Sequence, residues 1–429
     1  MAGASRPAAS VGDAYLERAT RFVHGYFTGT ANSLRLNVQV EDSTSHKTVE
    51  TAQIDGPMLA SVNALAKRLE PKAEPFSSSN EEAIAAWGRG EFEKAVALDP
   101  AFGTAWLAWI ETLARSGDTA GAIAVAGRAL QHPVKSEVDA LRIELTRATL
   151  QQDSHAEHEA LLKLTARVAD PRLLMNLGAL EVRTRAFDLA ESDYKKILAL
   201  EPDNAEALNL LGYTLGYQGK VVEAEVTFAH YGKQPGQQPN SFDSLGEVYF
   251  MNGRFAEAEK AFLHAHDLNA AFLAGGDLRK AAYAHWLAGD LAGADKTFDR
   301  YLDFRAKMKD STVEWQHAAW EFSTGRKDRA IARLQKSPFP QAPVQVRVWQ
   351  GDVKPPSDLD RLKQVYEATP PPADGLYRTL YAEALAARGN KDDAKKLAAR
   401  WPLPDSAGDL ALQSLVFPKY VALRRILGL

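Results

Sequence analysis

The stretch ALNLLGYTLGYQGKVVEAEVTFAHY (residues 207–231) decides the fold, because the chain repeats its pattern at a fixed interval. The segment SFDSLGEVYFMNGRFAEAEKAFLHA (241–265) follows it by 34 residues, and LLMNLGALEVRTRAFDLAESDYKKILALEP (173–202) precedes it in the same register. Each segment contains two runs of apolar residues at helical spacing, joined by a short turn. A repeat of this length made of two helices predicts a solenoid, in which each pair packs only against its neighbours.

Four series of positions keep this interval or lengthen it to 36 residues. Because paired helices approach most closely where side chains are small, we expect the Gly and Ala series at those contacts. The aromatic series is expected to fill the space between one repeat and the next, and the last glycine series to adopt positive φ where the first helix ends. The series are Gly178, Gly212, Gly246 and Ala282; Ala190, Ala224, Ala258, Ala294 and Ala330; Tyr194, Phe228, Phe262 and Phe298; and Gly219, Gly253, Gly289 and Gly325.

This pattern resembles the tetratricopeptide repeat over roughly residues 82–401. Less regular copies follow the same pattern at 105–130, 277–302, 313–334 and 376–401, and a more divergent pair fills 136–168. The resemblance implies a mostly α fold, an α-solenoid of about eight to nine helix pairs. It also implies a protein that binds other proteins, because the family is defined by interaction.

A different pattern precedes the repeats. From Arg21 to Ile54 short β-branched and aromatic segments alternate with turn formers, which predicts a small antiparallel β meander of three strands, and a helix is predicted at 57–69. The arrangement resembles the second half of a TolB-like module, which precedes helical repeats in bacterial regulators and receptor kinases, but the opening strand and helix of that module are missing. Because such a sheet has a small core and an open edge, we expect it to dock on the first repeats or to pair with something outside this chain.

These patterns divide the chain into successive segments. The stretch 340–372 contains seven prolines and departs from the repeat, and 409–429 has the pattern of an amphipathic capping helix. The predicted segments are a flexible tail (1–12), the small α+β module (13–70), a linker (71–81), the repeat array (82–338), an irregular Pro-rich or degenerate unit (339–372), and a terminal unit with the capping helix (373–429).

Composition limits the function classes further. The chain has a formal net charge of −4 and no cysteine, which excludes a disulfide framework and a thiol nucleophile and gives no reason to expect a nucleic acid partner. No apolar run is long enough to span a bilayer, and the N-terminus lacks the apolar segment of a signal peptide. We therefore expect a cytoplasmic protein, or a periplasmic one if the sequence is a fragment of a membrane protein. The oligomeric state is left open.

Candidate binding residues come from the resemblance. In tetratricopeptide repeats, ligands usually lie along the concave surface formed by the first helix of each pair. We expect Tyr213, Tyr217, Tyr283 and Arg279 to be exposed there, whereas Phe250, Trp286 and Phe322 fit either the groove or the interior. The corresponding positions are Asn209, Tyr213, Tyr217, Asp243, Glu247, Phe250, Arg279, Tyr283, Trp286 and Trp315.

Catalytic and metal motifs are incomplete. His155 and His158 have the spacing of two ligands on one helix face, but no HExxH pattern accompanies them, so a solvated polar face is the simpler interpretation. The chain also lacks a GxGxxG loop after a strand and a GxSxG motif. We expect no catalytic residue, cofactor or metal.

Three functional hypotheses follow. The first is a non-catalytic scaffold that binds a peptide or partner domain in the groove, in a bacterial regulatory or assembly context. The second is the sensory or regulatory portion of a larger bacterial kinase or transcription regulator, suggested by the module before the repeats. An enzyme is the third and weakest. Carboxylate-clamp recognition is not expected, because Met175 and Ala179 occupy the positions where that subtype has Lys and Asn.

Overall fold

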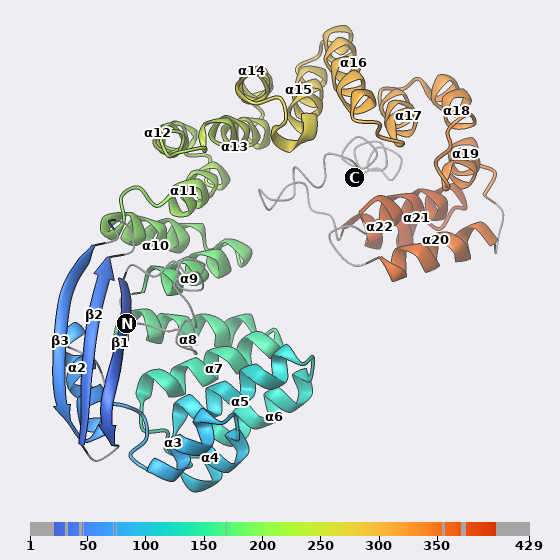
Figure 1. The fold of residues 1–429 in the computed structure, drawn as a ribbon. Coiled ribbons are helices and arrows are strands. Elements are labelled where there is room, and N and C mark those ends of the chain that lie inside the picture. Colours follow the sequence, from blue (N-terminus) through green and yellow to red (C-terminus); the bar gives the residue numbers. More distant parts are fainter. Residues whose placement is uncertain are drawn as a thin grey trace. The chain divides into compact units, whose positions relative to one another are not determined.

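The computed structural model describes residues 21–30, 33–42, 45, 47–71, 73, 75–168, 170–353, 357–369 and 375–399. Within them, a three-stranded sheet is followed by a long series of paired helices (Figure 1), as the sequence predicts. The chain divides into two compact units, residues 1–180 and 181–429, and each is described by itself. The predicted tail at 1–12 and capping helix at 409–429 lie outside the described residues.

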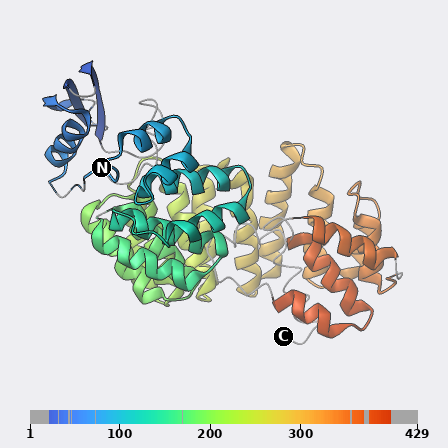
Figure 2. The same cartoon turned by 90° about the horizontal axis from the view of Figure 1, so that it is seen from below.

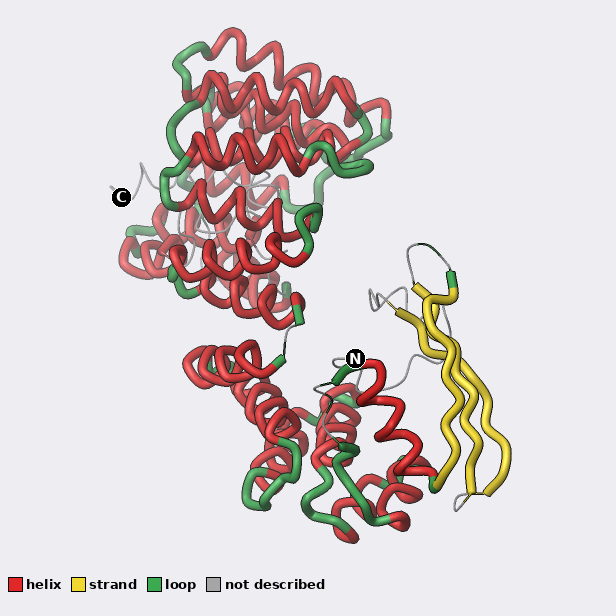
Figure 3. The backbone as a smooth tube through the Cα atoms, turned by 90° about the vertical axis from the view of Figure 1, so that its left-hand side faces the viewer, coloured by secondary structure: helices red, strands yellow, loops and turns green. Residues whose placement is uncertain are grey.

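The sheet is an antiparallel meander in the order β1 (Arg21–Thr30), β2 (Ser33–Asp42), β3 (Thr48–Gly56). Figure 3 shows the three strands twisting together as one narrow sheet. Helix α2 (Met58–Leu69) follows and lies along the sheet (Figure 2), with its main contacts to β2 and β3. Leu34, Leu36, Val38 and Val40 of β2 share one face because they alternate along the strand, and all but the half-buried Leu36 are buried.

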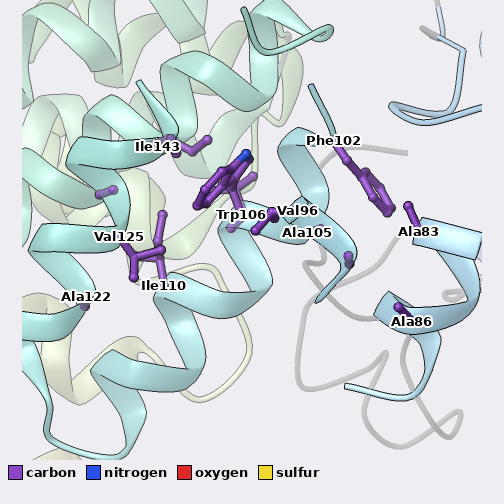
Figure 4. Close-up of a cluster of buried hydrophobic side chains, with 14 residues drawn as sticks. Ala83, Ala86, Val96, Phe102, Ala105, Trp106, Ile110, Ala122, Val125 and Ile143 are labelled. Carbon is purple, nitrogen blue, oxygen red and sulfur yellow. The ribbon is translucent and has the colours of Figure 1, made fainter. Parts of the chain in front are cut away.

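The first unit continues with helix pairs around an apolar core. Asn80 begins the first of these helices by accepting hydrogen bonds from two backbone N–H groups, and Phe76 of the linker packs edge-on against Phe102. Trp106 and Ile110 lie in the same core (Figure 4). The helices are α3 (Glu81–Gly88), α4 (Phe92–Leu98), α5 (Gly103–Arg115), α6 (Thr119–Ala129), α7 (Glu137–Gln151) and α8 (Ser154–Arg167), and α9 (Pro171–Arg183) crosses into the second unit.

The second unit contains the most regular pairs. Its elements are α10 (Phe187–Leu200), α11 (Ala205–Tyr217), α12 (Val221–Tyr231), α13 (Gln238–Met251), α14 (Phe255–Leu268), η1 (Phe272–Gly275), α15 (Gly276–Leu287), α16 (Leu291–Lys307), α17 (Val313–Ser323), α18 (Lys327–Leu334), α19 (Ala342–Gln350), α20 (Ser357–Ala368), α21 (Gly375–Ala387) and α22 (Lys391–Ala399). The proline-rich stretch thus contains the helices α19 and α20, while the predicted division into segments stays a prediction.

The repeated positions explain why the helices pair. The five alanines of the second series are fully buried, and the four aromatic residues are almost so, which confirms that both series belong to the core. Two of the rings pack against the glycine of their own pair: a Cβ added at Gly212 would come within 2.5 Å of the Phe228 ring, and one at Gly246 within 2.6 Å of Phe262. Phe262 and Phe298 also contact the next pair, through Lys280 and Trp320, as expected for rings that fill the space between repeats.

Positive φ at the helix turns is confirmed. The backbone φ lies between 73° and 102° at Gly219, Gly253, Gly289 and Gly325. Residues with a side chain rarely adopt such values. The lengthening from 34 to 36 residues coincides with η1, where Leu273, Ala274 and Gly275 all have positive φ. This irregular turn separates α14 from α15.

Candidate binding surface

The predicted groove residues lie on α11, α13, α15 and α17, the first helices of successive pairs. Five side chains on three of these helices form what we call the ionic cluster: Tyr213, Asp243, Glu247, Asp277 and Lys280. Asp243 and Glu247 are four residues apart on α13, and Asp277 and Lys280 are three apart on α15, so each pair shares a helix face. Tyr213 precedes Glu247 by one repeat of 34 residues and comes from α11.

Lys280 is the centre of the ionic cluster. Its Nζ donates to both carboxylate oxygens of Asp243 at 2.8 Å and to Oε1 of Glu247 at 2.6 Å. The Tyr213 hydroxyl donates to the other Glu247 oxygen at 2.8 Å. The side chain of Lys280 is 1% exposed and that of Glu247 is 2% exposed, so these ion pairs are removed from water.

Burial and mutual repulsion set the protonation of the carboxyl groups. Burial raises the pKa of Glu247 to about 7, although Lys280 opposes the shift. Burial, reinforced by the Asp243 carboxylate, raises the pKa of Asp277 to about 8. Burial alone would lower the pKa of Lys280, but Asp243 and Glu247 more than offset this effect and raise it. At neutral pH Asp277 is therefore mostly protonated, whereas Lys280 is charged.

Asn209 and Tyr217 lie on α11 four residues before and after Tyr213, and all three keep part of their surface exposed. The side-chain oxygen of Asn209 is buried without a hydrogen-bond partner among the described residues. Such an oxygen costs free energy unless a donor reaches it. Tyr217 stacks on Phe187 with ring centroids 5.2 Å apart.

Two predicted exposures are wrong. Arg279 and Tyr283 are buried rather than exposed. The Arg279 guanidinium lies over the Tyr301 ring and donates to its hydroxyl at 3.2 Å, because α15 turns this residue towards α16. Phe250, for which both placements were open, packs edge-on against Phe255 and is buried, whereas Trp286 and Phe322 keep partial exposure.

On the far side of α15 the contacts are made by rings. Phe298 stacks on Trp320 with centroids 4.5 Å apart, Tyr283 lies 5.8 Å from Trp320, and the Trp286 ring meets it edge-on. We call Tyr283, Trp286, Phe298 and Trp320 the aromatic cluster. These contacts hold α15, α16 and α17 together.

Trp315 is separate from both clusters. Its Nε1 donates to the buried Gln345 side chain at 2.9 Å, and its ring packs against Phe339. Trp315 is itself buried, so it belongs to the contact between α17 and α19. The structure therefore brings together Tyr213, Asp243 and Glu247 of the predicted set and sets Trp315 apart.

The sequence prediction missed Lys280 and Asp277. The prediction followed the spacing of 36 residues between Gly246 and Ala282, which leads from Asp243 to Arg279, and lysine next to it gave no sign of burial. The signal was available in the shorter interval, since 34 residues after Asp243 is Asp277.

The described residues contain neither a candidate metal site nor a candidate membrane span. In that part of the chain, no group of three or more His, Asp or Glu side chains could hold a metal ion. His155 lies on an exposed surface, 3.5 Å from Glu159. The described helices also include none with the length and apolar character needed to cross a membrane.

Comparison with known proteins supports the tetratricopeptide repeat. Residues 193–226, from within α10 to within α12, match the family described as Tetratricopeptide repeat. A TPR repeat-containing protein of Pseudomonas aeruginosa is 34% identical over 92 residues, which are 21% of this chain and 16% of that protein. The chain thus matches only a small part of that relative's length. The resemblance to a TolB-like module stays a prediction.

Solved structures give weaker likenesses. YrrB, a TPR protein with an unusual peptide-binding site, has a TM-score of 0.38 and 18% identity, covering 45% of this chain and 96% of its own. A tetratricopeptide repeat protein from Parabacteroides merdae has a TM-score of 0.38 and 16% identity over 65% of this chain and 98% of its own. The yeast Tom70 has a TM-score of 0.40 and 12% identity over 80% and 88%. Nothing about the partner or site of this chain follows from them.

Proposed function

We propose that α11, α13 and α15 form a surface that binds a peptide or partner domain, and that the protein is an interaction scaffold and not an enzyme. The partly exposed side chains of Asn209, Tyr213 and Tyr217, spaced four residues apart along α11, carry this proposal. The Asn209 amide can both donate to and accept from the backbone of a bound segment. Tyr213 and Tyr217 follow it on the same helix and offer contact area at a small entropic cost.

The ionic cluster supports this role by fixing the helices. It ties α11 to α13 through Tyr213 and Glu247, and α13 to α15 through Lys280. A surface held in one geometry loses less conformational entropy on binding. Asp243 and Glu247 then act as positioning residues, since Lys280 already occupies them.

The test compares the wild type with Asn209→Ala. Partners are captured by affinity purification, and the dissociation constant of a purified partner is then measured by calorimetry. We expect Asn209→Ala to weaken binding about tenfold, equivalent to about 1.4 kcal/mol, with an unchanged circular dichroism spectrum. Val226→Ala on the exposed side of α12 is the matched control. Equal binding by wild type and Asn209→Ala would show that the site lies elsewhere.

A second proposal is that the chain forms the sensory or regulatory portion of a larger bacterial kinase or transcription regulator. The observation that favours it is the small sheet before the repeats, whose strand β1 has only β2 as a neighbour among the described strands. Sequencing the complete reading frame decides between the two: a kinase or DNA-binding domain in the same frame supports regulation, and its absence supports the free-standing scaffold.

A further inference from the structure

The two edges of the sheet differ in how well they are protected. Strand β3 carries Glu50 and Asp55, and Arg68 of α2 pairs with Glu50 at 2.6 Å and donates to the backbone oxygen of Thr51 at 3.1 Å. The pairing of β3 with β2 is interrupted by a register shift at Val40 and Glu41. Charges and irregularities of this kind discourage the addition of another strand.

Within the part of the chain that the structure describes, strand β1 has none of these protections. Its ten residues pair with β2 in one unbroken register, and no charged residue or proline occurs from Phe22 to Thr30. Every residue from Val23 to Thr30 is exposed. An unprotected edge strand of this length is a template for pairing with another strand.

The exposed side chains of β1 extend the buried face of the sheet. Val23 lies opposite Val40 and Phe27 opposite Leu36, so both share the apolar face that α2 covers over β2 and β3. Phe27 is nevertheless 68% exposed and Val23 is 38% exposed, since the main contacts of α2 are with β3 and β2. The opposite face of β1 presents His24 and Tyr26.

We propose that β1 pairs antiparallel with β1 of a second copy of this chain, which joins two three-stranded sheets into one of six strands. A two-fold axis at Gly25 places Val23 opposite Phe27 of the other copy on the apolar face. It places His24 opposite Tyr26 on the polar face. Hydrophobic neighbours thus meet twice, and no like charges face each other.

Other registers fit less well. A shift by one residue would put apolar side chains on the polar face of the partner sheet. A shift by two would place Phe27 opposite Gly25 and Val23 opposite Gly29, which loses both apolar pairs. The second copy is therefore the occupant that this strand matches, and Gly25 is the central position of the pairing.

Sedimentation over a concentration series tests the proposal on the full chain. We expect the wild type to form a dimer, Phe27→Lys to raise its dissociation constant at least about tenfold, and Val49→Lys on the other edge to leave it unchanged. Phe27 and Val49 are both exposed, so neither change should unfold the sheet, and circular dichroism checks this. A wild type that stays monomeric throughout the series overturns the proposal, as does a dimer that Phe27→Lys leaves intact.

Spin labels test the register independently. The chain has no cysteine, so Thr28→Cys provides one labelling site per copy. Pairing centred on Gly25 separates the two labels by six residues along the strands, or about 20 Å at the usual rise per residue. A distance distribution centred there supports the register; one centred near about 13 Å would mean that the axis lies at Tyr26, and no dipolar coupling in a dimeric sample would mean that another surface pairs.

Discussion

The two sides of α15 are built from different chemistry. Towards α13 it buries Lys280 among carboxylates, and towards α16 and α17 it buries stacked rings. Ring packing gains free energy from the area removed from water and tolerates many geometries. A buried ion pair contributes little net stability but is costly to break, because one partner then remains charged and unpaired. The ionic side therefore specifies how α13 and α15 align, whereas the aromatic side contributes most of the packing free energy that holds α15 against α16 and α17.

The largest effect is expected from Lys280→Met. This change keeps most of the side-chain volume but leaves Asp243 and Glu247 buried without a cation. We expect a loss of about 3–5 kcal/mol in the free energy of unfolding, measured by urea denaturation. The matched control is Lys396→Met, whose ion pair with Asp393 joins two exposed side chains, and it should change stability little. Equal effects of the two changes would contradict the distinction between buried and exposed pairs.

Trp320→Ala tests the aromatic side. It removes the ring that stacks on Phe298 and contacts Tyr283, and it removes the Nε1 donor to Asp295 at 2.6 Å. We expect a loss of about 3 kcal/mol, at the lower end of the range for such truncations. The loss should be the same at pH 5.5 and pH 8, because no side chain of the aromatic cluster changes its charge between these two pH values. A loss that varied with pH would mean that the two sides of α15 are coupled.

The ionic side should depend on pH. The pKa of Asp277 is raised from an ordinary value of 3.8 to about 8, and that of Glu247 from 4.5 to about 7. Between the ordinary and the raised pKa of each group, the folded chain therefore binds more protons than the unfolded chain. The stability that the protonated groups contribute is lost as pH rises from about 4 to 8.

Asp277→Asn isolates this dependence, because asparagine imitates the protonated carboxyl. Between pH 6.5 and pH 8.5 we expect the variant to gain roughly 2 kcal/mol relative to the wild type in denaturation experiments. Asp203→Asn is the control, since the hydrogen bond from His230 lowers the pKa of this exposed carboxylate. The control should retain the wild-type fall in stability over the same pH range. A variant with the wild-type slope would assign the dependence to another group.

The repeated core was predictable because its causes are local. A glycine that must adopt positive φ, or an alanine where two helices touch, is required by geometry that returns with every repeat, and Gly219 and Ala224 behave as expected. The ionic cluster was not predictable in the same way. Lysine is ordinarily a surface residue, and the burial of Lys280 depends on two carboxylates from another helix. Asp243 and Glu247 were placed correctly on their helix, but their partner was not foreseen.

The smallest effect is expected at the outer end of the ionic cluster. Tyr213→Phe removes the hydroxyl that donates to Glu247 at 2.8 Å and keeps the ring that packs edge-on against Phe228. We expect a loss of about 1–1.5 kcal/mol at pH 8, because the hydrogen bond is made to an ionised carboxylate there. At pH 5.5, where Glu247 is mostly protonated, the loss should be smaller, so the effect should grow as pH rises through about 7. Tyr249→Phe is the matched control: its hydroxyl donates to Glu225 at 2.9 Å, but that carboxylate is partly exposed and paired with Arg254. Water can replace the lost donor at Glu225 and cannot at Glu247, so equal losses in the two variants would show that water reaches the ionic cluster.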